Sequence, residues 1–287
     1  MATVKQGTMF PTNLVTEMFS LVKGHSSIAK MVSSTPIAFN GNTEFTFSMD
    51  NKVSVVGESG EKPAGDATVT PVVIRPIKVV YQSRVSDEFV YASEEAKLNY
   101  LKAFTDGFAK RIAEGLDEMI MHGVNPATGT ASQVIGTNNL DAKITKTVTL
   151  TANPNTDLDA AIALVDDANG IILGKSIRSA IAALKTTDGG VMYPEFAWGA
   201  TPSELGGIKV DANKTVEANN ADARAYVGDF SALKWGFAKN IPLEVIEYGN
   251  PDGQGDLKNT NEVVLRSEAF VGWGILDANA FAAVTTV

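Results

Sequence analysis

Few side chains in this sequence combine the right type and spacing for acid–base, nucleophilic or metal chemistry. The chain has two histidines, His25 and His122, and no cysteine. Thiol nucleophiles and cysteine-ligated metals are therefore excluded, and two distant histidines do not predict a zinc site. No phosphate-binding glycine loop, G-x-S-x-G elbow or H-E-x-x-H motif occurs. We predict a structural role for both histidines.

The clustered acids give two weaker candidates. The segment 252–256, Asp-Gly-Gln-Gly-Asp, resembles a cation loop but lacks the spacing and final glutamate of an EF-hand, so an ordinary polar turn is predicted. Asp166 and Asp167 are adjacent near the end of a predicted helix, where neighbouring side chains point apart, which favours a solvated surface. The sequence thus predicts no catalytic residue, no metal ligand and no cofactor.

Composition narrows the class of protein. The chain has 287 residues, 44% of them hydrophobic, which suits one large or two smaller domains. No stretch approaches about 20 consecutive apolar residues, so no membrane span is predicted. The net charge is −9, and the lysines and arginines are scattered rather than gathered in a basic patch. Specific binding of nucleic acid through its phosphates is therefore not expected.

A long β-hairpin is predicted near the N-terminus. Three apolar residues alternate with polar ones, as in a β-strand: Phe45, Phe47 and Met49. A turn-rich segment, 57–66, leads to a second apolar run, Val69–Val80, where Pro71 and Pro76 favour an edge or distorted strand. The preceding stretch, Ser26–Pro36, reads as an extended arm with few partners of its own. Because an isolated hairpin is marginally stable in water, we expect a partner subunit to support it.

A long helix is predicted over Ser93–His122, with Ser93 as N-cap and Gly123 as a left-handed C-cap. Apolar residues recur along it every three or four positions: Leu98, Leu101, Phe104, Phe108, Ile112, Leu116 and Met119. This stripe predicts one buried face along the whole helix.

The remainder of the chain mixes helices and strands. Two helices are predicted, over Asp157–Asp167 and Ser176–Leu184. Strands are predicted at Lys146–Leu150, Ile171–Leu173, Ile208–Val210, Ala225–Val227, Trp235–Ala238, Leu243–Tyr248 and Glu262–Leu276. The fold class is therefore α+β.

This order of elements resembles the major capsid proteins of tailed bacteriophages, which have the Hong Kong 97-like fold. Six segments look like motifs of that family, in its order: Val56–Pro63 with Pro76–Lys78, Val85–Phe89, Thr187–Gly190 before Tyr193-Pro194, Leu205–Val210, Val227–Ser231, and Val264–Glu268 through Asp277–Phe281. Each motif is weak alone, but together they cover nearly the whole chain.

The resemblance implies a division of the chain into four parts. Residues 1–40 would form an N-terminal arm that runs along an adjacent subunit, and residues 41–84 an extended hairpin loop. Residues 85–152 and 262–287 would form a peripheral domain around the long spine helix. Residues 153–261 would form an axial α/β domain.

The resemblance also implies a self-assembling shell subunit rather than an enzyme. Copies would form the pentamers and hexamers of an icosahedral virion capsid, assembled in the host cytoplasm around double-stranded DNA that is not specifically bound. Portal and decoration proteins would be further partners. The chain passes from Met1 almost directly into the arm, so any scaffolding protein would be separate. The expected inter-subunit contact residues are Phe10, Leu14, Phe45, Phe47, Met49, Glu58 and Lys62.

Three alternatives stay open from the sequence alone. An encapsulin-like compartment subunit shares the fold and holds cargo enzymes instead of DNA. An α/β enzyme would use Asp166 or Asp229, although no nucleophile–base pair supports it. A monomeric binding module would leave the hairpin and the arm without support.

Overall fold

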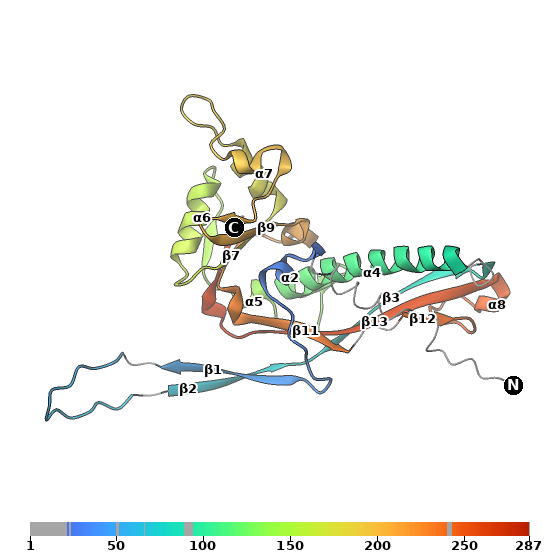
Figure 1. Ribbon diagram of the computed structural model, residues 1–287, viewed down its shortest axis with the longest axis horizontal. Coiled ribbons are helices and arrows are strands. Elements are labelled where there is room, and N and C mark those ends of the chain that lie inside the picture. The colour runs from blue at the N-terminus through green and yellow to red at the C-terminus, as the bar shows by residue number, and fades with distance from the viewer. Residues whose placement is uncertain are drawn as a thin grey trace.

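The computed structural model of the chain describes residues 22, 24–49, 52–65, 67–88, 94–239 and 243–286. Over these residues the fold is α+β, with two large sheets and one long helix. Figure 1 shows an elongated body, a lobe of helices and strands standing over one end of it, and a hairpin that projects past the body. The predicted fold class is confirmed.

A four-stranded sheet forms the floor of the body. Its strands are β3 (Ile77–Ser86), β11 (Leu233–Lys239), β12 (Leu243–Ile246) and β13 (Glu262–Ile275). The central strand β13 pairs antiparallel with β3 on one side and with β11 and β12 in succession on the other. One side of β13, with Val271 and Trp273, joins the large buried cluster that also contains residues of the long helix.

The long helix α4 (Glu94–His122) lies along this sheet (Figure 1). Of its predicted apolar stripe, Leu101, Phe108, Ile112, Leu116 and Met119 are buried, which confirms the prediction. The helix ends at Gly123, whose φ of 68° is the left-handed cap that glycine allows. The predicted N-cap, Ser93, lies outside the described residues, as does the side chain of Leu98.

A second, six-stranded sheet forms the lobe. In spatial order its strands are β6 (Thr147–Thr149), β14 (Phe281–Thr285), β10 (Ala223–Gly228), β7 (Gly170–Leu173), β9 (Ile208–Ala212) and β8 (Glu204–Leu205). The helices α6 (Pro154–Ala163) and α7 (Lys175–Ala183) pack against it around a separate buried cluster. These elements confirm the helices and strands predicted for this part of the chain.

The two sheets are joined by consecutive strands. Strand β13 of the body leads through the short 3₁₀ helix η4 (Ala278–Ala280) directly into β14 of the lobe. Strands β6 and β14 of the lobe thus come from outside the range 153–261 predicted as the axial domain. The four-part division of the chain stays a prediction.

Shorter elements complete the described part. They are β4 (Val124–Asn125), β5 (Thr130–Ala131), α5 (Leu140–Lys143), η1 (Pro194–Gly199), η2 (Lys214–Asn220), η3 (Phe230–Ala232) and α8 (Leu257–Thr260).

The projecting hairpin consists of β1 (Asn42–Met49) and β2 (Ala67–Ile74), paired antiparallel over their full lengths. The second apolar run, Val69–Val80, was predicted as an edge or distorted strand and instead contains parts of two strands, β2 and β3. The chain breaks at Arg75-Pro76, and β3 then leaves the hairpin to pair with β13. Pro71 lies within β2 and has no backbone N–H to donate. A proline is tolerated in this strand because β2 is an edge strand of a two-stranded sheet.

Candidate assembly surfaces

The hairpin presents one apolar side to solvent. Phe45, Phe47 and Met49 lie on the same side of β1, because alternate residues of a strand share a side, and they are 68%, 59% and 73% exposed. On β2, Pro71 pairs with Phe45 and Val69 pairs with Phe47, and Val73 lies two residues beyond Pro71 on the same side. All three β2 residues are apolar. We call these six residues the hairpin face.

The other side of the hairpin is attached to the body at its base. Ile74 is buried, and its side chain lies directly over Gly274 of β13, with Val72 beside it. Glu44, which pairs with Val72, forms an ion pair with Lys234 of β11 at 2.7 Å. The described residues of the subunit therefore hold the hairpin by one side and leave the hairpin face uncovered.

The tip of the hairpin is exposed over its described residues. Val53 and Val55 are fully exposed, and the predicted contact residues Glu58 and Lys62 are also exposed. The other two predicted contact residues, Phe10 and Leu14, lie outside the described part of the chain.

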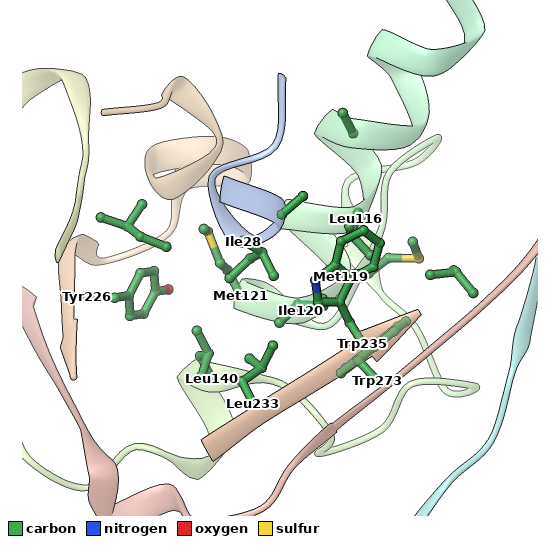
Figure 2. Close-up of a cluster of buried hydrophobic side chains, with 14 of the residues drawn as sticks. Ile28, Leu116, Met119, Ile120, Met121, Leu140, Tyr226, Leu233, Trp235 and Trp273 are labelled. Atoms are coloured by element: carbon green, nitrogen blue, oxygen red, sulfur yellow. The ribbon is translucent and has the colours of Figure 1, made fainter. Parts of the chain in front are cut away.

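The N-terminal segment is anchored to its own subunit, contrary to the prediction that Ser26–Pro36 has few partners. It contains the short helix α2 (Ser27–Met31), which is capped by the hydroxyl of Ser26. Figure 2 shows Ile28 of α2 among the buried side chains of α4 and β11, near Leu116 and Trp235. The serine-rich composition predicted an exposed chain. Ser33 and Ser34 are exposed, but Ser26 and Ser27 are buried and hydrogen-bonded.

The partner of those serines is Asp117 of α4, which is 0% exposed. Its carboxylate accepts hydrogen bonds from Ser26 Oγ at 2.6 Å and from the backbone N–H groups of Ser27 and Ile28 at 2.9 and 3.1 Å. From the segment between β9 and β10 it accepts bonds from Thr215 Oγ1 and Asn213 Nδ2. Burial raises the pKa of Asp117 to about 6, although these hydrogen bonds act in the opposite direction.

Sequence reasoning missed Asp117. A signal was present, because Asp117 lies four residues from both Ala113 and Met121, which are buried. An acid on a buried helical face requires partners that hold its charge.

The arm then runs along the edge of the four-stranded sheet. The N–H groups of Thr35 and Ile37 donate to the carbonyl oxygens of Trp235 and Phe237 in β11. Gly236 lies at this crossing, and a Cβ placed on it would stand 1.7 Å from the carbonyl oxygen of Thr35. The close approach of the two backbones therefore requires glycine.

His122 is the buried histidine, with a side chain 3% exposed. Its Nδ1 lies 2.7 Å from a carboxylate oxygen of Asp141, and Tyr226 donates its hydroxyl hydrogen to the other oxygen of that carboxylate. Burial lowers the pKa of His122, but Asp141 and the carbonyl of Thr215 outweigh it and hold the pKa above the usual 6.5. Burial, followed by Asp141, raises the pKa of Tyr226. His25, by contrast, is exposed.

The acidic segment 252–256 is an ordinary polar turn tied to the sheet. Arg84 of β3 donates to both carboxylate oxygens of Asp252, at 2.6 and 2.7 Å, and to Glu262 at 2.8 Å. These bonds to Arg84 hold the pKa of Asp252 near 2. The carboxylate that would ligate a cation is thus engaged by a guanidinium.

The remaining acids of the enzyme alternative show no catalytic arrangement. Asp166 and Asp167 are exposed, and Asp229 caps η3 by accepting from the backbone N–H of Ser231. Across the described ranges, no group of three His, Cys, Asp or Glu side chains is placed to hold a metal ion. Among the helices of the described residues, none is long and apolar enough to cross a membrane.

Comparison with known proteins agrees with this architecture. The model of the phage capsid family matches residues 6–286. A solved structure from Mycobacterium phage Ogopogo is 33% identical, with a TM-score of 0.78 over 91% of this chain and 92% of that one. A structure from Gordonia phage Cozz is 24% identical, with a TM-score of 0.71 over 91% and 86%. No curated protein sequence matches.

A more distant structure shares the fold. It is described as the capsid of a native GTA particle, is 13% identical, and has a TM-score of 0.64 over 90% of this chain and 89% of that one. These matches confirm the Hong Kong 97-like fold and favour a capsid protein over a cargo compartment or an α/β enzyme. The chain therefore belongs to the phage capsid family, as a major capsid protein that assembles with copies of itself into a virion shell.

Proposed function

We propose that this protein forms pentamers and hexamers that close into an icosahedral shell around the double-stranded DNA genome of a tailed phage. The observation that carries the proposal is the hairpin face, a row of large apolar side chains that projects from the body and that the described part of the chain leaves uncovered. Exposed apolar surface of this kind marks an interaction site.

The energetics favour a neighbouring subunit as the cover. Full burial of a Phe, Met or Val side chain stabilises an association by about 1.5–3 kcal/mol. A lone two-stranded hairpin is marginal in water, so packing against a neighbour would also order the hairpin itself. Phe45, Phe47 and Met49 would supply most of this contact, and Glu58 and Lys62 at the tip would add polar contacts.

The net charge of −9 suits a wall that encloses DNA without gripping it. Packaged DNA would then be held by confinement rather than by specific contacts. A portal, decoration proteins and, if assembly requires one, a scaffolding protein would be the other partners, and assembly would take place in the host cytoplasm.

Negative-stain electron microscopy of the purified full-length protein, with and without a co-expressed candidate scaffolding protein, tests the proposal. Closed shells with fivefold and sixfold capsomers are the expected result. A protein that stays monomeric at high concentration under both conditions would contradict it. Nuclease-protected double-stranded DNA in particles recovered from infected cells would test the cargo separately.

A further inference from the structure

We infer that Asp117 is a positioning residue for assembly, the anchor that holds the arm from Ser26 onwards on its own subunit. The assembly part of this inference rests on the proposed function. The anchoring part concerns the single subunit and stands on the contacts alone.

The first argument is the convergence of bonds on one buried carboxylate. Within the described chain five hydrogen bonds reach Asp117, three of them from the arm and two from the segment 213–215. Bonds to a charged acceptor are about twice as strong as neutral ones. The arm therefore loses its main polar attachment if the carboxylate is removed.

The second argument is that a carboxylate is the only side-chain group that fits the two backbone donors. The N–H of Ser27 points at Oδ2 of Asp117 and the N–H of Ile28 points at Oδ1. The hydroxyl of Ser26 can rotate and accept a hydrogen bond instead of donating one, but a backbone N–H can only donate. In Asp117→Asn, either orientation of the amide would set its NH₂ group against one of these N–H donors.

The third argument is that the arm's other described contacts, among them the buried Ile37 and the ring contact of Phe39 with Phe270, involve no fully buried carboxylate. Apart from the apolar side chains of Val22, Ile28 and Ala29, its described attachments include the edge contacts of Thr35 and Ile37 with β11. The indole Nε1 of Trp235 also donates to the carbonyl oxygen of Val32. Loss of the anchor would free α2 and weaken the cover over the β11 edge, while α4 keeps its own helical bonds.

Lys30 and Asp211 form a secondary contact beside the anchor. Lys30 of α2 pairs with Asp211 of β9 at 2.7 Å, and Ser27 Oγ donates to the same carboxylate. The Lys30 side chain is 40% exposed, so solvent screens this pair, and it cannot replace the buried anchor.

Hydrogen exchange of unassembled full-length subunits tests the anchor directly. In Asp117→Asn, the amides of Ser27, Ile28, Thr35 and Ile37 are expected to exchange about tenfold faster or more, the effect of losing one hydrogen bond to a charged group. The amides of α4 and of the six-stranded sheet should keep wild-type rates. Unchanged exchange rates in the arm would overturn the inference. Equal acceleration in the arm and in α4 would overturn it too, because it would mean that Asp117 stabilises the whole subunit and not the arm in particular.

Two matched variants sharpen the test. Glu118→Gln changes the neighbouring acid, which accepts a bond from Asn219 at an exposed site, and should leave the arm unchanged. Thr215→Val removes a hydrogen bond to the same carboxylate from the segment 213–215 and keeps all three bonds from the arm. The arm amides should therefore exchange as in wild type. If Asp117→Asn does not fold, Ser26→Ala, which removes one arm bond and the α2 cap, must accelerate the same arm amides for the inference to hold.

Electron microscopy of the same variants tests the assembly part. Subunits with a released arm are expected to give fewer closed shells and more irregular particles than Glu118→Gln. Wild-type yields of closed shells from subunits with a released arm would overturn the positioning role and leave the proposed function intact. Failure of the wild type itself to assemble would instead count against the proposed function.

Discussion

The Nε2 atom of His122 lies 2.8 Å from the carbonyl oxygen of Thr215, so this ring nitrogen must carry a hydrogen. The other ring nitrogen faces the carboxylate of Asp141, which also accepts from Tyr226. The arrangement favours the imidazolium form, in which both nitrogens donate. His122 thus links the C-terminal end of α4 to both α5 and η2 through a buried charge.

This arrangement predicts a pH-dependent contribution to stability. Because the pKa of His122 is raised in the folded protein, its contribution is fully present below the usual pKa of 6.5 and is lost as the pH rises through the raised value. The difference in unfolding free energy between wild type and His122→Gln should therefore be largest in mildly acidic buffer and shrink at alkaline pH. Chemical denaturation across the pH range measures it, and His25→Gln reports the effect of removing an exposed imidazole. A difference that grows with pH would contradict the assignment.

Two glycine-to-alanine changes should shift stability in opposite directions. Gly236→Ala places a methyl group against the carbonyl oxygen of Thr35, which should destabilise the subunit by about 1–3 kcal/mol and loosen the arm. Gly107→Ala, in α4, meets no atom within 4 Å and should stabilise by up to about 1 kcal/mol through helix propensity. Thermal unfolding of both variants measures the two changes in stability. Equal effects would show that the arm does not cross β11 as described.

Arg84 should control the order of the segment 249–256. Arg84→Lys keeps the charge but cannot donate in parallel to both oxygens of Asp252, so the backbone amides of Gln254 and Gly255 should exchange several-fold faster. The depressed pKa of Asp252 means that the ion pair contributes above pH 3.8 and is lost as the pH falls towards 2. Arg111→Lys, at a helical ion pair whose arginine is exposed, should leave the segment unchanged. Wild-type exchange in Arg84→Lys would show that Asp252 is not what orders the turn.

The hairpin face should affect assembly without affecting the fold of the subunit. Phe47→Ser removes a side chain that is 59% exposed in the subunit, so its unfolding temperature should stay near the wild-type value. If a neighbour buries Phe47, the concentration needed for shell formation should rise by about tenfold or more. Val134→Ser, an exposed apolar residue away from the hairpin, is the matched control. Light scattering during assembly measures both, and equal thresholds would rule out a contact at Phe47.

The sequence predicted those elements whose pattern is local. The apolar stripe of α4 repeats every three or four residues, and Gly123 ends the helix where expected. The long strand β13 was predicted within one residue at its C-terminal end. Alternation at Phe45, Phe47 and Met49 predicted strand β1 and its apolar side, and the exposure of that side is confirmed, although contact with a neighbour stays a prediction.

What the sequence did not predict depends on partners far along the chain. Ser26 looks like a residue of an exposed arm until Asp117, 91 residues away, supplies its acceptor. Likewise, Pro76 predicted a distortion in the run Val69–Val80, but the sequence did not predict that β3 leaves the hairpin, because its partner β13 lies far along the chain. Local pattern gives the type of an element, and tertiary hydrogen bonding decides where it goes.

The direct passage from β13 into β14 has a mechanical consequence. A force that pulls on β13 reaches the lobe through the covalent backbone between Ile275 and Phe281, without passing through a noncovalent contact. Near the two ends of that segment, the N–H of Leu276 donates to the carbonyl oxygen of Ala232, and the carbonyl oxygen of Ala280 accepts from the N–H of Asp229. Both bonds tie the segment to the chain around η3. A shell stretched from within would therefore strain its subunits as single units, and its weakest points would be the contacts between subunits.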